Sequence, residues 1–191
     1  MKSPRIHIAG GRLIDPANGI DGESDLYLED GRVKGIGLAP DGFAPEFSID
    51  ARGLVVCPGL VDICARLREP GQEHKATLRS ETRAAARGGI TTVCCPPDTS
   101  PVIDTPAMAT LVRRRAQHIG NTRVLPVGAL TQGLLGSELS ELATLKQAHC
   151  VAFSNAELPL ANTLVERRAL EYAATFDILV MLRPEDRHLR N

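Results

Sequence analysis

Residues 77–95 decide the fold, and they read TLRSETRAAARGGITTVCC. Residues 77–87 have the composition of a helix, and the Gly88-Gly89 pair supplies the residues that commonly end one. The β-branched run at 90–95 predicts a buried strand. A helix that leads through a short turn into an apolar strand is typical of proteins with a parallel sheet.

The same alternation continues toward the carboxyl end. Thr105 and Pro106 begin a second predicted helix, and Asn162 caps a fourth. Leucines at helical spacing predict a third helix between residues 135 and 145. Further strands are predicted at 54–61, 124–129, 150–153 and 178–182, and the first of them is expected to be buried and interrupted by Pro58-Gly59. Such a series predicts a parallel sheet covered by helices, and it suits a (β/α) barrel at least as well as a doubly wound sheet.

The first 55 residues follow a different pattern. Apolar and polar residues alternate around residues 5–8 and 25–28, and an Asp30-Gly31 turn leads into a further strand at 32–36. This pattern predicts a small, mostly antiparallel β unit. The expected domains are therefore 1–55, the β unit, and 56–191, part of an α/β fold. Because a complete (β/α) barrel takes about 250 residues, we expect the chain to be an N-terminal part, truncated after the fifth strand. A compact open sheet complete in 191 residues is the alternative.

Composition excludes several classes of protein. With 43% hydrophobic residues and a net charge of −1, the chain is globular and has no electrostatic bias toward nucleic acid or an anionic membrane. It has no apolar run long enough to span a membrane and no signal-peptide core, so a cytoplasmic location is expected. The odd number of cysteines (57, 64, 94, 95 and 150) favours reduced thiols. Of these, Cys57 and Cys150 are expected in the core.

Residues 58–71 read PGLVDICARLREPG, and this stretch resembles the first-strand signature of the cyclic amidohydrolases, specifically the dihydroorotases, PGLVDxHxHxREPG. Further matching segments follow in order at 80–93, 97–104, 127–133, 151–154 and 168–173, so the resemblance spans nearly the whole chain. It implies that 56–191 form the first half of an amidohydrolase-type (β/α) barrel and that the β unit is part of a β-sandwich. It also implies metal-assisted hydrolysis of a cyclic amide.

The chain departs from that pattern at each metal-ligand position it contains. Cys64 and Arg66 stand where the signature has its paired histidines, Asn155 replaces an acidic residue or modified lysine, and Arg183 replaces a histidine. A thiolate ligates zinc, but a guanidinium has no lone pair to offer. We therefore predict no metal, no cofactor and no catalytic residues. Arg66 and Arg183 are expected to supply fixed positive charge by pairing with Glu69, Glu185 or Asp186.

The substrate-binding residues are changed as well. Arg68 matches the arginine with which the family holds the substrate carboxylate, whereas Asp98 replaces the family's asparagine. A carboxylate there would repel an anionic substrate, and a salt bridge between Asp98 and Arg68 is expected. These two residues are thus a remnant of a substrate site.

The resemblance implies membership of a non-catalytic dihydroorotase-like subfamily that assembles with the catalytic chain of aspartate transcarbamoylase in pyrimidine biosynthesis. The expected function is a pseudoenzyme subunit of a hetero-oligomer, with its contacts on the outer helices or the β unit. The basic run at 113–115 is either a solvated helix face or part of such an interface. Alternatives are an active amidohydrolase with a metal held by Cys64, a module that senses a pyrimidine precursor through Arg68, and a truncated product without function.

Overall fold

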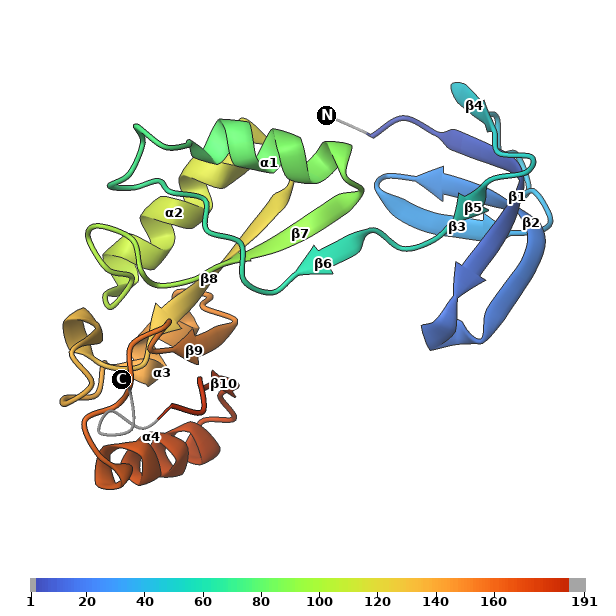
Figure 1. Ribbon diagram of the computed structural model, residues 1–191. Helices are drawn as coiled ribbons and strands as arrows, with labels where there is room; N and C mark the ends of the chain where they lie inside the picture. Colours follow the sequence, from blue (N-terminus) through green and yellow to red (C-terminus); the bar gives the residue numbers. More distant parts are fainter. Residues whose placement is uncertain (1–2, 186–191) are drawn as a thin grey trace. The chain divides into compact units, whose positions relative to one another are not determined.

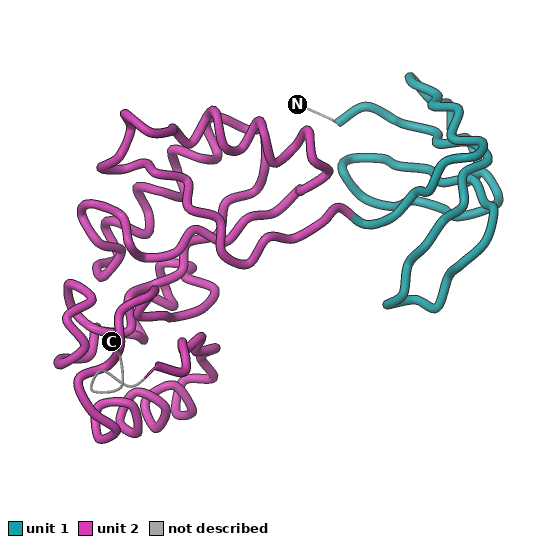
Figure 2. Tube along the Cα trace, in the orientation of Figure 1, with its two compact units in different colours: residues 1–58 teal, residues 59–191 magenta. Residues whose placement is uncertain are grey.

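The computed structural model describes residues 3–185. The chain divides into two compact units, residues 1–58 and 59–191 (Figure 2). Each unit has its own five-stranded sheet, and each is described below by itself.

The first unit is a small sheet with the strand order β3-β2-β1-β4, and β5 pairs with β1 as well. Its strands are β1 (Ile6–Asp15), β2 (Ile20–Glu29), β3 (Arg32–Ile36), β4 (Phe47–Asp50) and β5 (Val55–Val56). The first three strands pair antiparallel, whereas β4 and β5 run parallel to β1. Asp30 and Gly31 both have positive φ, as the tight turn between β2 and β3 requires. The predicted antiparallel hairpin is confirmed.

The second unit is a parallel sheet with the strand order β10-β9-β8-β7-β6 (Figure 1). Its strands are β6 (Leu60–Asp62), β7 (Ile90–Cys95), β8 (Arg123–Ala129), β9 (Ala152–Ser154) and β10 (Val180–Met181). The intervening helices are α1 (Leu78–Arg87), α2 (Pro106–Ile119), α3 (Leu142–Gln147) and α4 (Thr163–Thr175), with short 3₁₀ turns at Pro16–Asn18 in the first unit and Gln132–Leu134 in the second. Each strand pairs with the next one in the sequence, which is the order found along the wall of a (β/α) barrel.

Local capping explains where the helices begin. The hydroxyl of Thr77 accepts a hydrogen bond from the backbone N–H of Ser80 while the Ser80 hydroxyl accepts one from the backbone of Thr77, so the two close the first turn of α1 reciprocally. Thr105 precedes Pro106 at the start of α2, and Asn162 accepts from Val165 N–H at the start of α4. These three helix starts confirm the sequence prediction.

The core of the second unit lies between its sheet and its helices. Fully buried side chains come from β7, β8, β9 and all of the first three helices; they include Leu78, Val93, Val112, Val127, Leu142, Leu145 and Phe153. Gly128 on β8 lies against Phe153, because a Cβ at this position would approach the Phe153 ring to 2.6 Å. This close packing fixes β8 and β9 relative to one another.

Three local predictions are wrong. The segment 54–61 is two short strands in different sheets, and Leu60 and Val61 are 58% and 60% exposed because β6 is an edge strand. Cys57 lies between β5 and β6 and is exposed, so the prediction that it belongs to the core is wrong. Cys150 is buried, as predicted. The third helix covers only Leu142–Gln147, because Leu139 is extended and forms a β-bridge with Thr131.

None of the helices among residues 3–185 is long and apolar enough to cross a membrane.

Candidate functional site

The side chains singled out by the sequence lie beyond the carboxyl ends of the parallel strands, where barrels of this type place their active sites. Cys64 and Arg66 follow β6, Asp98 follows β7, Asn155 follows β9 and Arg183 follows β10. A cavity of about 230 Å³ brings three of them together, because Cys64, Arg66 and Arg183 all line it. Asn155 lies outside this lining.

Arg66 forms the electrostatic centre of this cavity. Its Nε donates a 2.7 Å hydrogen bond to Oδ2 of Asp98, and its Nη2 lies 3.0 Å from Oε1 of Glu157. The hydrogen bond to Asp98 raises the pKa of Arg66, so the guanidinium stays charged. The side chains of Arg66 and Asp98 are only 29% and 31% exposed, so water screens this pair less than it screens an exposed one.

These partners differ from the predicted ones. Asp98 was expected to pair with Arg68, and Arg66 with one of the acids Glu69, Glu185 or Asp186. Glu69 instead accepts from the backbone N–H of Leu78 at 2.8 Å and pairs with Arg115 at 3.2 Å. Arg66 contacts the loop after β7, whereas Glu69 contacts the start of α1 and a side chain of α2.

Arg68 lies beside this ion pair without joining it. Its Nη1 donates to Oε1 of Gln72 at 3.2 Å. Arg68, Arg66 and Asp98 all line one small crevice that has about 10 Å³ of free space, less than a single water molecule needs. The two remnant substrate-binding residues therefore share a surface, but the carboxylate of Asp98 is bound to Arg66.

Asn155 is a structural residue. Its side chain is buried, its Nδ2 donates to the carbonyl oxygens of Leu134 at 3.3 Å and Leu158 at 3.0 Å, and its Oδ1 accepts from the Thr131 hydroxyl at 2.5 Å. The same hydroxyl accepts from the backbone N–H of Gly136. All of the amide's polar atoms are thus occupied in holding the loops after β8 and β9 together.

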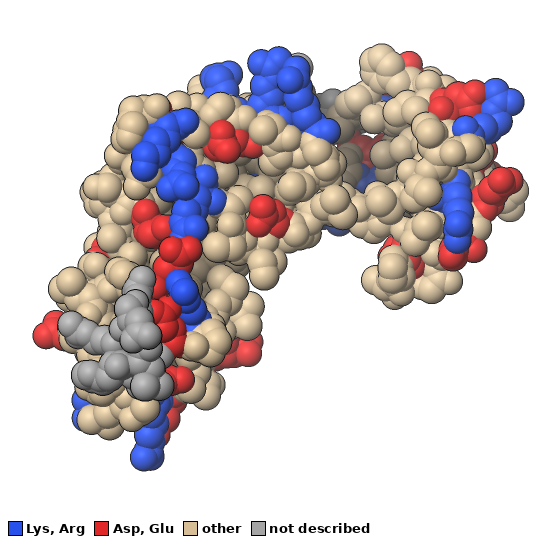
Figure 3. Space-filling model, viewed as in Figure 1, with Lys and Arg blue, Asp and Glu red and all other residues tan. Residues whose placement is uncertain are grey.

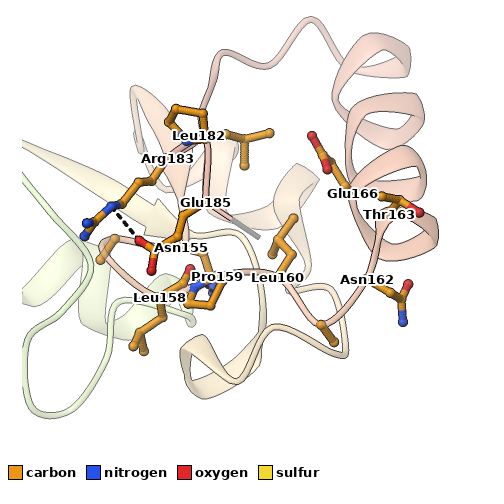
Figure 4. A pocket seen from close by; sticks show the side chains of 13 residues that line it. Asn155, Leu158, Pro159, Leu160, Asn162, Thr163, Glu166, Leu182, Arg183 and Glu185 are labelled. Carbon is orange, nitrogen blue, oxygen red and sulfur yellow. Dashed lines mark hydrogen bonds and ion pairs between the residues drawn. The ribbon is translucent and has the colours of Figure 1, made fainter. Parts of the chain in front are cut away.

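Nε of Arg183 lies 2.7 Å from Oε2 of Glu185, so this predicted ion pair is confirmed. Both residues also line a second cavity, of about 470 Å³, between the loop after β9, the start of α4 and the segment after β10 (Figure 4). Figure 4 shows the Arg183 side chain extending away from Glu166 and Thr163 of α4. Asp186, the other predicted partner, lies outside the described residues.

The thiols differ in environment. Cys64 is exposed at the cavity, whereas Cys94 and Cys95 lie on β7. Burial raises the pKa of Cys94, and it raises the pKa of Cys95 to about 12. Neither of these two thiols is therefore ionised at neutral pH, and ionised thiolate is the form that ligates zinc.

The residues present do not fit a divalent metal. Arg66 and Arg183 carry permanent positive charge and offer no lone pair, and the oxygen of Asn155 is committed to Thr131. Within residues 3–185, no group of three or more histidine, cysteine, aspartate or glutamate side chains is arranged to hold a metal ion. Of the four altered ligand positions, 64, 66, 155 and 183, only Cys64 retains the chemistry of a zinc ligand.

Sequence reasoning missed one partner in this arrangement. Glu157 contacts Arg66, and it lies only two residues after Asn155, the altered position in the same segment. The signal available was an acidic residue just after a strand whose carboxyl end must lie near that of β6. Without the strand curvature, that signal does not single out Glu157 from other acids in loops.

The sequence model of a protein family described as "Dihydro-orotase-like" matches residues 53–191 of this chain. The chain belongs to the dihydroorotase-like family. It is 51% identical over 184 residues to a "Dihydroorotase-like protein" of Pseudomonas aeruginosa and 50% identical to one of Pseudomonas putida. It is also 45% identical over 182 residues to a "Dihydroorotase" of Syntrophotalea carbinolica.

These alignments cover 95–96% of this chain but only 43–44% of the relatives, so the chain spans less than half of the length of the curated relatives it matches. Among solved structures, it is similar to the L-hydantoinase of Arthrobacter aurescens, with a TM-score of 0.80, 20% identity, and coverage of 98% of this chain and 42% of that one. A D-hydantoinase from a Thermus species gives a TM-score of 0.70 at 18% identity, covering 96% of this chain and 41% of that one. These similarities confirm the fold: an antiparallel β unit followed by the first part of an amidohydrolase-type barrel.

Proposed function

We propose that this member of the dihydroorotase-like family is a non-catalytic homologue that serves as a structural or assembly subunit for the catalytic chain of aspartate transcarbamoylase in pyrimidine biosynthesis. The non-catalytic part of the proposal rests on the position and the contacts of Arg66. Its guanidinium stands at one of the positions that the family resemblance assigns to a metal-ligating histidine, and it is held there by Asp98 and Glu157.

This arrangement opposes hydrolysis of a cyclic amide in two ways. Hydrolysis at neutral pH needs an activated water, and a guanidinium does not act as a base because it stays protonated. In addition, Asp98 and Glu157 place two carboxylates against the Arg66 guanidinium, so an anionic substrate that approached it would meet acidic groups instead of the amide of an asparagine.

The assembly role is supported by what the chain retains. The chain has a buried core, capped helices and the strand order of a (β/α) barrel wall, while the ligand positions of the family signature carry other residues. A fold that keeps its structure without its site is available for interactions through its surface, since function resides in sites and surfaces and not in the fold itself. The partner follows from the resemblance to the non-catalytic subfamily.

Co-assembly tests this proposal directly. The whole protein that contains this chain would be mixed with the aspartate transcarbamoylase catalytic chain of the same organism and analysed by size-exclusion chromatography with light scattering. We expect one large species that contains both chains, and no hydrolysis of dihydroorotate by the isolated protein. Separate elution would overturn the assembly role. Metal-dependent hydrolysis would overturn the non-catalytic role and favour an active enzyme that uses Cys64.

A further inference from the structure

One face of α1 carries a row of arginines. Arg79, Arg83 and Arg87 follow one another at intervals of four residues, which places them side by side along the helix. All three are exposed. Figure 3 shows lysine and arginine side chains gathered over α1. We call these three residues the α1 arginine row.

The row has no acidic partner within residues 3–185. No ion pair in this part of the chain involves Arg79, Arg83 or Arg87. Arginines elsewhere in the same unit differ among themselves: Arg66, Arg115 and Arg167 are paired, and Arg168 is not paired with any described residue. The acidic residue of α1, Glu81, lies near the Ser80 hydroxyl. Like charges four residues apart on a helix repel one another and destabilise it. The row is therefore a cost to the isolated chain that an acidic partner would relieve.

The helix presents this row on a fixed support. A different face of the helix is anchored by Leu78 and Thr82, which are 0% and 1% exposed. The Thr82 backbone carbonyl also accepts a 3.0 Å hydrogen bond from the hydroxyl of Thr122, just before β8. At a rise of about 1.5 Å per residue, the eight steps from Arg79 to Arg87 span about 12 Å. The exposed Ala84 and Ala86 beside the row let a partner approach the helix closely.

We infer that the α1 arginine row docks an acidic protein surface, and that it is the contact surface for the partner chain. This inference rests on the proposed function. Charge complementarity identifies the occupant: the planar guanidinium fork matches carboxylates in a bidentate geometry. A protein is favoured over nucleic acid because the basic row is only about 12 Å long and the chain as a whole has a net charge of −1 and 3% aromatic residues.

The test compares two charge reversals with the same change in net charge. Arg83→Glu alters the centre of the row. Arg168→Glu is the matched control, because Arg168 is likewise exposed on a helix, α4, and no ion pair within residues 3–185 involves it. Affinity for the aspartate transcarbamoylase catalytic chain is measured by biolayer interferometry on the whole protein, with circular dichroism as the check on folding. We expect Arg83→Glu to weaken binding by about tenfold or more, and Arg168→Glu to change it by less than about twofold.

Salt dependence gives a second readout. Raising the salt concentration should weaken wild-type binding, and the slope should become shallower when Arg79, Arg83 and Arg87 are all changed to glutamine, since each removed charge removes a screened attraction. The inference would be overturned if the variants bound with the same affinity and the same salt slope as the wild type. The proposed function would still stand in that case.

The remaining outcomes separate the two proposals. If the wild-type protein forms no complex, the proposed function fails, and the docking surface fails with it. A labelled single-stranded RNA of mixed sequence provides the other comparison. If the wild type binds this RNA and Arg83→Glu does not, while binding to the protein partner is unchanged, the row binds nucleic acid and the inference is wrong.

Discussion

Nε of Arg66 donates a 2.7 Å hydrogen bond to Oδ2 of Asp98, which lies 32 residues further along the chain. This bond connects the segment after β6 with the segment after β7, and the contact of Arg66 with Glu157 adds the segment after β9. One guanidinium thus ties together the carboxyl ends of three strands. An ion-pair cluster connects the strand ends at the residues that the family resemblance assigns to metal ligands.

Loss of this guanidinium is expected to reduce stability. Arg66→Met removes the partner of two carboxylates, one of which is only 31% exposed, and should lower the free energy of unfolding by about 1–2 kcal/mol in urea titrations. Arg68→Met is the matched control, because Arg68 forms only a 3.2 Å bond to Gln72 and should cost about 0.5 kcal/mol or less. Equal effects of the two variants would show that the Arg66 cluster does not hold the strand ends.

The metal content of the wild-type protein is the second measurement. After dialysis against zinc and removal of free ion, we expect mass spectrometry to find well below one zinc per chain, because only Cys64 among the four altered ligand positions retains ligand chemistry. One zinc per chain that is lost in Cys64→Ser would contradict this expectation and would favour a metal site completed by other groups.

Restoring the acidic residue at position 155 is expected to be harmful and to depend on pH. In Asn155→Asp, a carboxylate oxygen would face the carbonyl oxygens of Leu134 and Leu158 in a buried site, with an expected loss of about 2–4 kcal/mol at pH 8. Burial and these carbonyls would raise the pKa of the new aspartate in the folded state. The folded state therefore holds the proton more tightly, so the variant's penalty is smallest below the unfolded pKa and grows as pH rises through the folded pKa.

Urea titrations at pH 5 and pH 8 would measure this difference. Asn162→Asp is the control of equal chemistry, because Asn162 caps α4 at an exposed position where aspartate caps equally well. We expect its stability to stay within about 0.5 kcal/mol of the wild type. A penalty in Asn155→Asp that is the same at both pH values would refute the buried hydrogen-bond network as its cause.

Thiol reactivity should follow burial. Cys57 and Cys64 are exposed and should react within seconds to minutes with a chromogenic disulfide reagent at pH 8. Cys95 and Cys150 are buried, and burial raises the pKa of each to about 12, so they should react only when the protein unfolds. In Cys64→Ser, the fast phase should lose one thiol. Fast reaction of Cys95 in the native protein would contradict the packing of β7.

Sequence patterns predicted the parts of this structure that depend on neighbouring residues. Thr105 and Asn162 are recognisable as helix starts because capping joins residues two or three positions apart, and the helix at 77–87 is recognisable from its composition and from the Gly88-Gly89 pair that ends it. The pattern failed where distant packing decides. The leucines from 135 to 145 have helical spacing, but the bridge between Thr131 and Leu139 draws part of that segment into extended structure.

The amino-acid sequence by itself determined which chemistry stands at the altered positions. A guanidinium at 66 and 183 is a permanent cation in any fold, and the family match needs no coordinates. What each group does depends on the tertiary structure: Asp98 binds Arg66 and not Arg68, the Asn155 side chain is held between the loops after β8 and β9, and no ion pair within residues 3–185 involves Arg79, Arg83 or Arg87. The physical reason is that ion pairs and hydrogen bonds form within about 4 Å, and proximity between residues 30 or more positions apart is set by how the strands pack.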